Sequence, residues 1–291
     1  MRAAVLGATG FVGRALVPTL AERMDVVAVS RAGDAPAAER VQPVAADALQ
    51  PQSLRRSLDG VDVVYHLVHS LGQANFGDVD RRAATNVAAE AARAGVKQIV
   101  FLGGLGDDDP HLSDHLRSRA ETARLLTEGE VPVTTLRAAI VVGRGSAAFD
   151  TVVALVDRLP VMVAPRWVAM PTQPIALADV VAYLRDVAGH ADTVGETFDL
   201  GGPDVLTYRQ MIEHIGELRG RRPCILEVPV LSPRLSSYWL HVITPVRAGV
   251  ARPLVEGLRN PTVAKDTRIQ ELLPRELLSF DAAARQALSL D

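Results

Sequence analysis

The sequence predicts an α/β fold with a doubly wound parallel sheet and a small carboxyl-terminal α/β lobe. Short apolar runs rich in β-branched residues alternate with helical patterns through the first half of the 291 residues, which is typical of a parallel sheet covered on both faces. The first strand runs directly into glycines spaced G-x-x-G-x-x-G, at Gly7, Gly10 and Gly13. After about residue 145 the alternation breaks down and prolines cluster. This change indicates a separate, smaller unit.

The apolar runs give the expected elements in order. We expect strands near residues 2–6, 25–30, 41–45, 61–67, 97–103 and 132–142. We expect helices between them, near residues 11–22, 51–58, 78–94 and 113–128. Pro51 falls at a first helical position, where its missing N–H is no loss, and Gly95 follows a long alanine-rich helix, where a left-handed cap is favoured.

The second half divides between the sheet and the lobe. Residues 172–202 still have the pattern of a core, with an apolar helix and then a strand at 197–200. We therefore expect a nucleotide-binding domain formed by residues 1–147 and 172–202. A substrate-binding lobe formed by residues 148–171 and 203–291 is expected over the carboxyl ends of the strands, where such sheets bind ligands.

Composition excludes several classes of function. The net charge is −3 and the 31 basic residues are scattered, so we expect no nucleic-acid partner. The single cysteine, Cys224, excludes an internal disulfide and a multi-cysteine metal site, and we expect it to be buried in an apolar strand. The amino-terminal residues lack the basic region and cleavage site of a secretory signal. A cytoplasmic protein, monomeric or homodimeric, is expected.

One apolar stretch in the lobe, residues 228–250, is long enough that a membrane-spanning helix has to be considered. Prolines and arginines interrupt it, which leaves too few uninterrupted residues to span a bilayer. We expect a lobe helix that carries Tyr238 and Trp239, with a helix at the membrane surface as the alternative. These two side chains and His69 are the expected substrate contacts.

The glycine spacing predicts a cradle for a dinucleotide. A pyrophosphate needs a tight turn without a Cβ atom, bare backbone N–H groups and a helix N-terminus behind them. In this reading Gly7 makes the turn, Gly10 lets the phosphates approach and Gly13 lets the helix pack on its strand. The alternative is a glycine turn with no ligand.

The end of the second predicted strand bears on the choice of cofactor. Ser30 and Arg31 stand where an acidic residue would bind the ribose hydroxyls of NAD. A guanidinium suits a 2′-phosphate, so the sequence favours NADP, with NAD as the alternative. Arg31 as a solvated loop residue is the other reading. Asp47 is placed either to bind the adenine amino group or to cap the helix that starts at Pro51.

These residues resemble those of the atypical short-chain dehydrogenase/reductase superfamily, in its NAD(P)H-binding, NmrA-like branch. The superfamily resemblance lies in residues 7–13, Asp47, residues 62–67, Asn86 and residues 95–100. A narrower resemblance, to the bacterial YbjT-like group, lies in residues 69–70, 101–106, 115–119, 159–163 and 235–239. The resemblance implies a Rossmann sheet. The expected cofactor contacts are Gly7, Thr9, Gly10, Phe11, Val12, Gly13, Ser30, Arg31, Asp47, Ala48, Leu67, His69 and Arg119.

The sequence departs from the superfamily at the catalytic positions. Active members use a Ser or Thr at the end of the fifth strand and Tyr-x-x-x-Lys on the next helix, whereas this chain has Gly103, Gly104, His115 and Arg119 there. Residues four apart share a helix face. His115 is the best acid/base candidate because a histidine titrates near the working pH, the alternative being that it faces solvent. Arg119 has no neutral form to pass protons, and we expect it to hold the nicotinamide ribose.

The resemblance implies an NAD(P)-dependent oxidoreductase that transfers hydride to or from a small carbonyl or quinone-like molecule. The missing Ser, Tyr and Lys leave a second hypothesis, a non-catalytic NADP-binding redox sensor or assembly factor. A solvated acidic loop is expected at Asp107, Asp108 and Asp109, with His111 close by. We therefore expect no metal site.

Overall fold

The computed structural model describes residues 1–70, 72–73, 75–106, 112–228 and 260–290. Its central sheet has seven strands in the order β11-β6-β5-β4-β1-β2-β3, and every neighbouring pair is parallel. The strands are β1 (Arg2–Leu6), β2 (Asp25–Ser30), β3 (Val41–Ala45), β4 (Val63–His66), β5 (Gln98–Gly104), β6 (Val133–Ala138) and β11 (Thr197–Leu200). The chain adds strands on one side of β1 and then on the other. The expected doubly wound fold is confirmed, with its switch point between β1 and β4.

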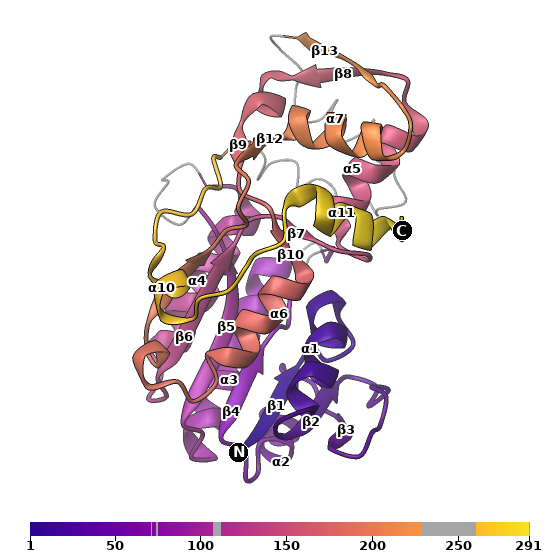
Figure 1. Cartoon of the computed structure of the whole chain (residues 1–291). Helices are drawn as coiled ribbons and strands as arrows, with labels where there is room; N and C mark the ends of the chain where they lie inside the picture. The colour runs from indigo at the N-terminus through magenta and orange to yellow at the C-terminus, as the bar shows by residue number, and fades with distance from the viewer. Residues whose placement is uncertain (71, 74, 107–111, 229–259, 291) are drawn as a thin grey trace.

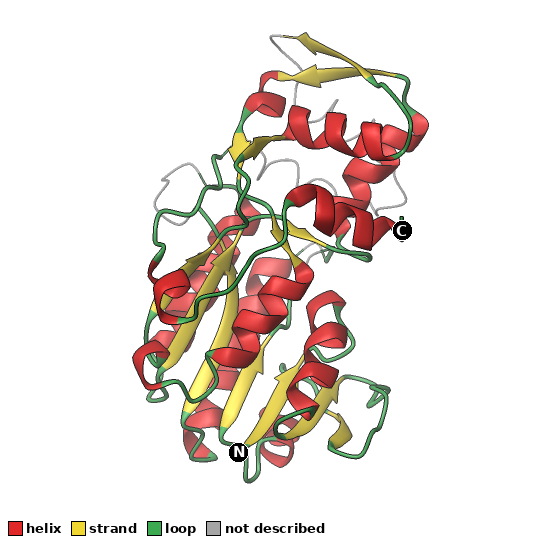
Figure 2. Ribbon diagram, in the orientation of Figure 1, coloured by secondary structure: helices red, strands yellow, loops and turns green. Residues whose placement is uncertain are grey.

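Helices cover both faces of this sheet (Figures 1 and 2). On one face α1 (Phe11–Ala21) and α6 (Leu177–Asp186) pack in one core with the strands. On the other face α2 (Pro51–Ser57), α3 (Phe76–Arg93) and α4 (Asp114–Thr127) form a second core. The strands are apolar in both directions because both of their faces are buried.

Most of the remaining elements form a lobe at the carboxyl ends of the strands, as Figure 1 shows. A third core joins α5 (Ala147–Arg158), α7 (Tyr208–Leu218) and α11 (Phe280–Leu288). A parallel ribbon of β8 (Val161–Pro165) and β13 (Cys224–Val228) lies at its far end. Two short strand pairs are β7 (Val141–Val142) with β10 (Ile175–Ala176), and β9 (Pro171–Thr172) with β12 (Leu206–Thr207). The short helices are η1 (Arg166–Ala169), η2 (Ala191–Thr193) and α10 (Arg268–Leu272).

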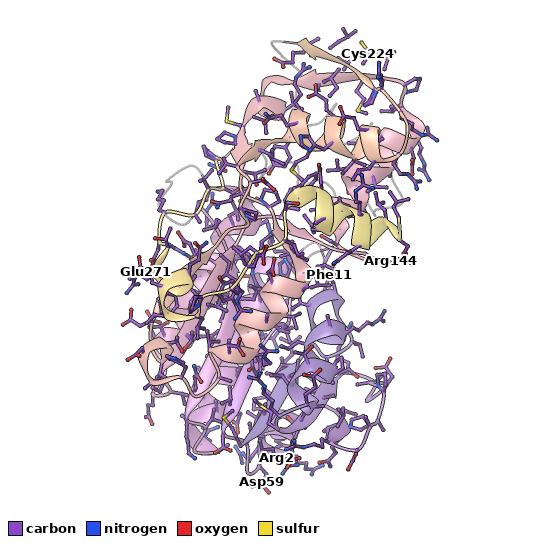
Figure 3. The ribbon with its side chains drawn as sticks, in the orientation of Figure 1. Arg2, Phe11, Asp59, Arg144, Cys224 and Glu271 are labelled. Carbon is purple, nitrogen blue, oxygen red and sulfur yellow. The ribbon has the colours of Figure 1, made fainter. Side chains whose placement is uncertain are left out.

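Two local expectations were wrong. The strand expected at 132–142 is divided, because β6 ends at Ala138 and the chain then leaves the central sheet to pair Val141 and Val142 with β10. Cys224 is exposed rather than buried, since the ribbon that carries it lies at the far end of the lobe (Figure 3). The division of the chain into two units stays a prediction. Ile269, which we assigned to the lobe, is buried in the core shared by α1 and α6.

No helix within the described ranges is long and apolar enough to cross a membrane.

Candidate functional site

The glycine loop between β1 and α1 has the geometry that the sequence predicts. Gly7 has φ +92°, and a β-carbon there would lie 3.0 Å from the Leu67 carbonyl oxygen. A β-carbon on Gly13 would lie 2.2 Å from the Gly7 carbonyl oxygen, so the backbone leaves no room for a side chain. A β-carbon on Gly10 would have one neighbouring atom within 4 Å, the Gly7 carbonyl oxygen at 3.1 Å. The loop is therefore closed at Gly7 and Gly13 and open at Gly10.

The start of α1 suits an anion. No side chain caps this helix and no acidic residue lies in its first turn, so its first N–H groups and the positive end of its dipole are available to a ligand. Phe11, its first residue, lies at the end of α1 that faces the lobe (Figure 3). An uncapped helix behind an open glycine fits the pyrophosphate of a dinucleotide.

Two cavities meet at this loop. One, of about 430 Å³, extends toward the lobe, and the other, of about 280 Å³, extends over the ends of β1 and β2. Four residues line both cavities: Gly7, Gly10, Leu67 and His69. A dinucleotide has two nucleotide halves joined by a pyrophosphate. The two cavities therefore match the two halves, with the glycine loop at the pyrophosphate. We refer to the two spaces as the lobe-side cavity and the adenine-side cavity.

Every residue that we expect to contact the cofactor lines one of these cavities. On the adenine side alone are Thr9, Ser30, Arg31, Asp47 and Ala48. On the lobe side alone are Phe11, Val12, Gly13 and Arg119. The structure brings the set together, and the individual contacts stay predictions.

Local hydrogen bonds shape the adenine-side cavity. The Leu49 N–H donates to the Asp47 carboxylate (2.9 Å), and α2 begins after Gln50; the reading of Asp47 as the cap of this helix was therefore wrong. The Asn86 amide donates to the Ala48 carbonyl (3.0 Å), which ties this loop to α3. The Ser30 hydroxyl donates to Asp34 (2.6 Å).

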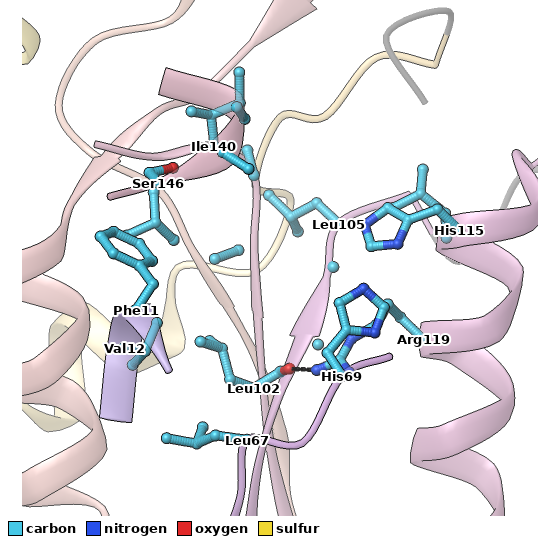
Figure 4. Close-up of a pocket in the computed structure, with 18 of the residues that line it drawn as sticks. Phe11, Val12, Leu67, His69, Leu102, Leu105, His115, Arg119, Ile140 and Ser146 are labelled. Carbon is cyan, nitrogen blue, oxygen red and sulfur yellow. Dashed lines mark hydrogen bonds between the residues drawn. The ribbon is translucent and has the colours of Figure 1, made fainter. Parts of the chain in front are cut away.

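The lobe-side cavity has mainly apolar walls. Figure 4 shows Phe11, Leu102, Leu105 and Ile140 around it, which come from three segments of the chain. Gly104 ends β5, and a β-carbon there would lie 2.9 Å from the Leu116 side chain.

Arg119 is buried and held by the ends of two strands. Its guanidinium donates to the Leu102 carbonyl and, at 3.5 Å, to the Val68 carbonyl. It also packs over Phe101, 4.5 Å from the ring centre. Burial lowers the pKa of Arg119 to about 10. The side chain therefore links the loop after β4 to β5 at the wall of the cavity.

His115 lines the same cavity from the first turn of α4. Burial, together with nearby His69 and Arg119, lowers its pKa to about 3. The expectation that it titrates near neutral pH was therefore wrong, because the apolar walls remove its hydration. A neutral imidazole still donates one N–H, and such a group can polarise a carbonyl.

The sequence analysis missed a buried carboxylate behind these histidines. Asp80 is 2% exposed and accepts hydrogen bonds from His69 Nδ1 (2.9 Å), the Ser70 N–H (2.9 Å), the Ser70 hydroxyl (2.5 Å) and the Ser118 hydroxyl (3.3 Å). Burial by itself raises the pKa of Asp80, but the hydrogen bonds from His69 and Ser70 lower it to about 2. A signal was present, since Asp80 lies at helical spacing with the buried Ala84 of α3.

Other predicted residues lie outside the described residues. These are Tyr238 and Trp239, and also Asp107, Asp108, Asp109 and His111. Within the ranges that the structure does describe, no group of three or more His, Cys, Asp or Glu side chains could hold a metal ion.

Comparison with known proteins agrees with this geometry. Residues 7–145 match a family described as NAD(P)H-binding. The chain is 25% identical over 244 residues to the mitochondrial NADH dehydrogenase [ubiquinone] 1 alpha subcomplex subunit 9 of Arabidopsis thaliana, with 78% of this chain and 60% of that protein covered. It is 28% identical over 237 residues to a ceramide reductase of Caulobacter vibrioides, with 78% of this chain and 73% of that protein covered.

A solved structure extends the likeness to the whole fold. An NADPH-dependent quinone oxidoreductase of Escherichia coli, complexed with NADPH, matches with a TM-score of 0.78 at 21% identity, covering 100% of this chain and 99% of that one. This likeness confirms the expected Rossmann-like fold, and the family match at residues 7–145 supports an NAD(P)H cofactor.

Proposed function

We propose that the protein is an NADPH-dependent reductase of small, largely apolar carbonyl or quinone-like molecules, since residues 7–145 match the NAD(P)H-binding family. The observation that carries the proposal is the pair of cavities that meet at the glycine loop, with His69 and His115 in the wall of the lobe-side cavity. When bound, the reduced nicotinamide supplies a hydride to the substrate. The side chains of this chain would hold the cofactor, exclude water and handle the proton.

The preference for the phosphorylated cofactor rests on the adenine-side cavity. Arg31 is the cationic side chain in its lining and Asp47 the acidic one. No described residue forms an ion pair with Arg31, so its guanidinium is available to a 2′-phosphate.

The class of substrate follows from the lobe-side walls. Apolar side chains dominate the lining, and the polar groups that face it include neutral His115, His69 and Arg119. Such a site favours a flat or aliphatic molecule that carries one carbonyl, since most of the substrate surface would meet apolar walls. The similarity to a quinone oxidoreductase and to a ceramide reductase supports this class.

The direct experiment is NADPH consumption by the purified protein across a panel of quinones, aldehydes and ketones. We expect turnover of some apolar members, with product formed in proportion to NADPH consumed. The matched control is a Gly10→Val variant, which blocks the open face of the loop. Turnover that persists in this variant would contradict the site.

A second candidate is a sensor or assembly factor that binds NADP without chemistry. The observation that favours it is the lack of a Ser or Thr at the end of β5 and of the Tyr-x-x-x-Lys pattern at the start of α4, and one relative is named as a subunit of a larger complex. This candidate predicts no turnover and a cofactor-dependent change in the affinity of a protein partner. A cytoplasmic location and a monomeric or homodimeric state stay predictions under either function.

A further inference from the structure

The tautomer of His69 is fixed by the carboxylate behind it. An ionised carboxylate only accepts hydrogen bonds, and Asp80 lies 2.9 Å from His69 Nδ1. The hydrogen of a neutral His69 must therefore be on Nδ1, which leaves the lone pair on Nε2. In the described part of the chain this Nε2 is buried and has no hydrogen-bond partner. His69 lines both cavities, at the point where they meet.

Burying the Asp80 carboxylate is unfavourable unless hydrogen bonds compensate its lost hydration. Among the described residues no Lys or Arg side chain bonds to Asp80, and its charge is held by Ser70, Ser118 and His69. Removing a carboxylate from water costs several kcal/mol before such bonds form. Two serines from different segments thus stabilise the negative charge, and one oxygen of the carboxylate remains directed at the imidazole.

A second histidine adjoins the free nitrogen. The ring centres of His69 and His115 are 5.0 Å apart, at 38° to each other. Figure 4 shows the two rings next to each other at the wall of the lobe-side cavity, above Arg119. His115 Nδ1 is also buried without a partner within the described residues. Two imidazoles with unused nitrogens therefore meet in one wall, and of these two rings His69 is the one hydrogen-bonded to the Asp80 carboxylate.

We infer that His69 is the acid–base residue of the site and that Asp80 is the positioning residue that fixes its tautomer. This inference rests on the proposed reduction. For reduction, His69 first takes up a proton from solvent on Nε2, and Asp80 stabilises this imidazolium. As hydride reaches the carbonyl carbon, the C=O π electrons move to oxygen and Nε2 gives its proton to that oxygen, which returns His69 to its neutral Nδ1–H form. In the reverse direction Nε2 accepts the hydroxyl proton, and Asp80 stabilises the resulting imidazolium. His115 acts beside it as a neutral hydrogen-bond donor.

The groups around His69 set its pH behaviour. Asp80 approaches from α3 and favours the protonated ring, whereas Arg119 from α4 and the burial of the ring disfavour it. His115 of α4 and His66 of β4 also lie nearby, each with a pKa lowered to about 3. Burial is the largest of these effects, so the pKa of His69 is lowered. Carbonyl reduction should therefore slow as the pH rises above that pKa.

The test is the Asp80→Asn variant, read first without substrate. The asparagine amide can still accept from Ser70, but its NH₂ group now faces His69 Nδ1 and should move the imidazole hydrogen to Nε2. Long-range ¹H–¹⁵N NMR of the histidine nitrogens reports this tautomer. We expect the Nδ1–H form in the wild type and the Nε2–H form in the variant. The matched control, Asp78→Asn, changes an exposed carboxylate of the same helix and should leave the spectrum of His69 unchanged.

Turnover completes the test. Asp80→Asn should lower kcat by about 10²- to 10⁴-fold, the usual range for general acid–base catalysis, with the Kd of NADPH changed by less than about threefold. It should also remove the fall of kcat with rising pH. If Asp80→Asn does not fold, Ser70→Ala, which removes the 2.5 Å bond and keeps the carboxylate, should give a smaller loss of kcat with a shifted pH profile.

A wild-type His69 that carries its hydrogen on Nε2 would overturn the inference. So would a variant with the switched tautomer and full turnover. If the wild type turns over no substrate, the proposed function fails, whereas the NMR measurement still decides whether Asp80 positions His69.

Discussion

Replacing Arg31 by alanine should convert an NADPH-preferring site into one that hardly distinguishes NADPH from NADH. Arg31 is the cationic side chain in the lining of the adenine-side cavity. Ser30 is a poor substitute because its hydroxyl is engaged with Asp34 (2.6 Å). A hydrogen bond to a charged group contributes about 1.5–3 kcal/mol, and since Arg31 is exposed, solvent screening favours the lower end. The Kd of NADPH should therefore rise about tenfold.

Calorimetric titration with both cofactors, at one fixed ionic strength, measures this difference. NADH lacks the 2′-phosphate, so its Kd should change by less than about twofold. The control is Arg40→Ala, which removes another surface arginine, one that pairs with Asp25 at 3.0 Å, and should affect neither cofactor. Equal losses for NADPH and NADH, or no loss for either, would refute the assignment of Arg31 to the phosphate.

Four further variants test the same contacts. Gly13→Ala should lower the free energy of unfolding by about 3 kcal/mol in urea titrations, because its β-carbon would lie 2.2 Å from a backbone oxygen. Gly10→Val should fold but lose the thermal stabilisation that NADPH gives the wild type. Full stabilisation of Gly10→Val by NADPH would contradict the assignment of the glycine loop to the pyrophosphate. His115→Phe should remove most turnover and leave the Kd of NADPH nearly unchanged, and a variant with normal kcat would exclude His115 from the site. Burial lowers the pKa of His66 and of His115 to about 3. Below about pH 6.5 these two side chains therefore bind more protons in the unfolded chain than in the folded one. The free energy of unfolding should consequently fall as the pH drops. Urea titrations between about pH 7 and pH 5 should show this slope reduced by up to about 1.4 kcal/mol per pH unit in His66→Phe, and an unchanged slope would show that His66 does not contribute.

The nucleotide half of the site was predictable because local sequence determines it. A strand, three glycines at fixed spacing and a helix start are all within residues 1–21, and their geometry requires little from the rest of the chain. Arg31 and Asp47 follow strand ends, and the carboxyl ends of parallel strands meet at one edge of the sheet.

The catalytic half depends on contacts that the sequence does not display. An aspartate in a helix is usually exposed, and one hydrogen-bond partner of buried Asp80, Ser118, is 38 positions away on another helix. The low pKa of His115 results from walls contributed by β5, α1 and the start of the lobe, so an isolated helix pattern could not predict it. The exposure of Cys224 has a similar origin, since its apolar strand pairs in a peripheral ribbon rather than in the central sheet.

Isotope transfer shows directly whether hydride passes from NADPH to a substrate in the lobe-side cavity. NADPH deuterated at the transferable C4 position would be incubated with the protein and the apolar carbonyl compounds, and the products analysed by mass spectrometry. We predict one deuterium on the carbinol carbon of each product molecule, with none in Gly10→Val. Binding of NADPH without deuterium in any product would contradict the claim and favour the sensor.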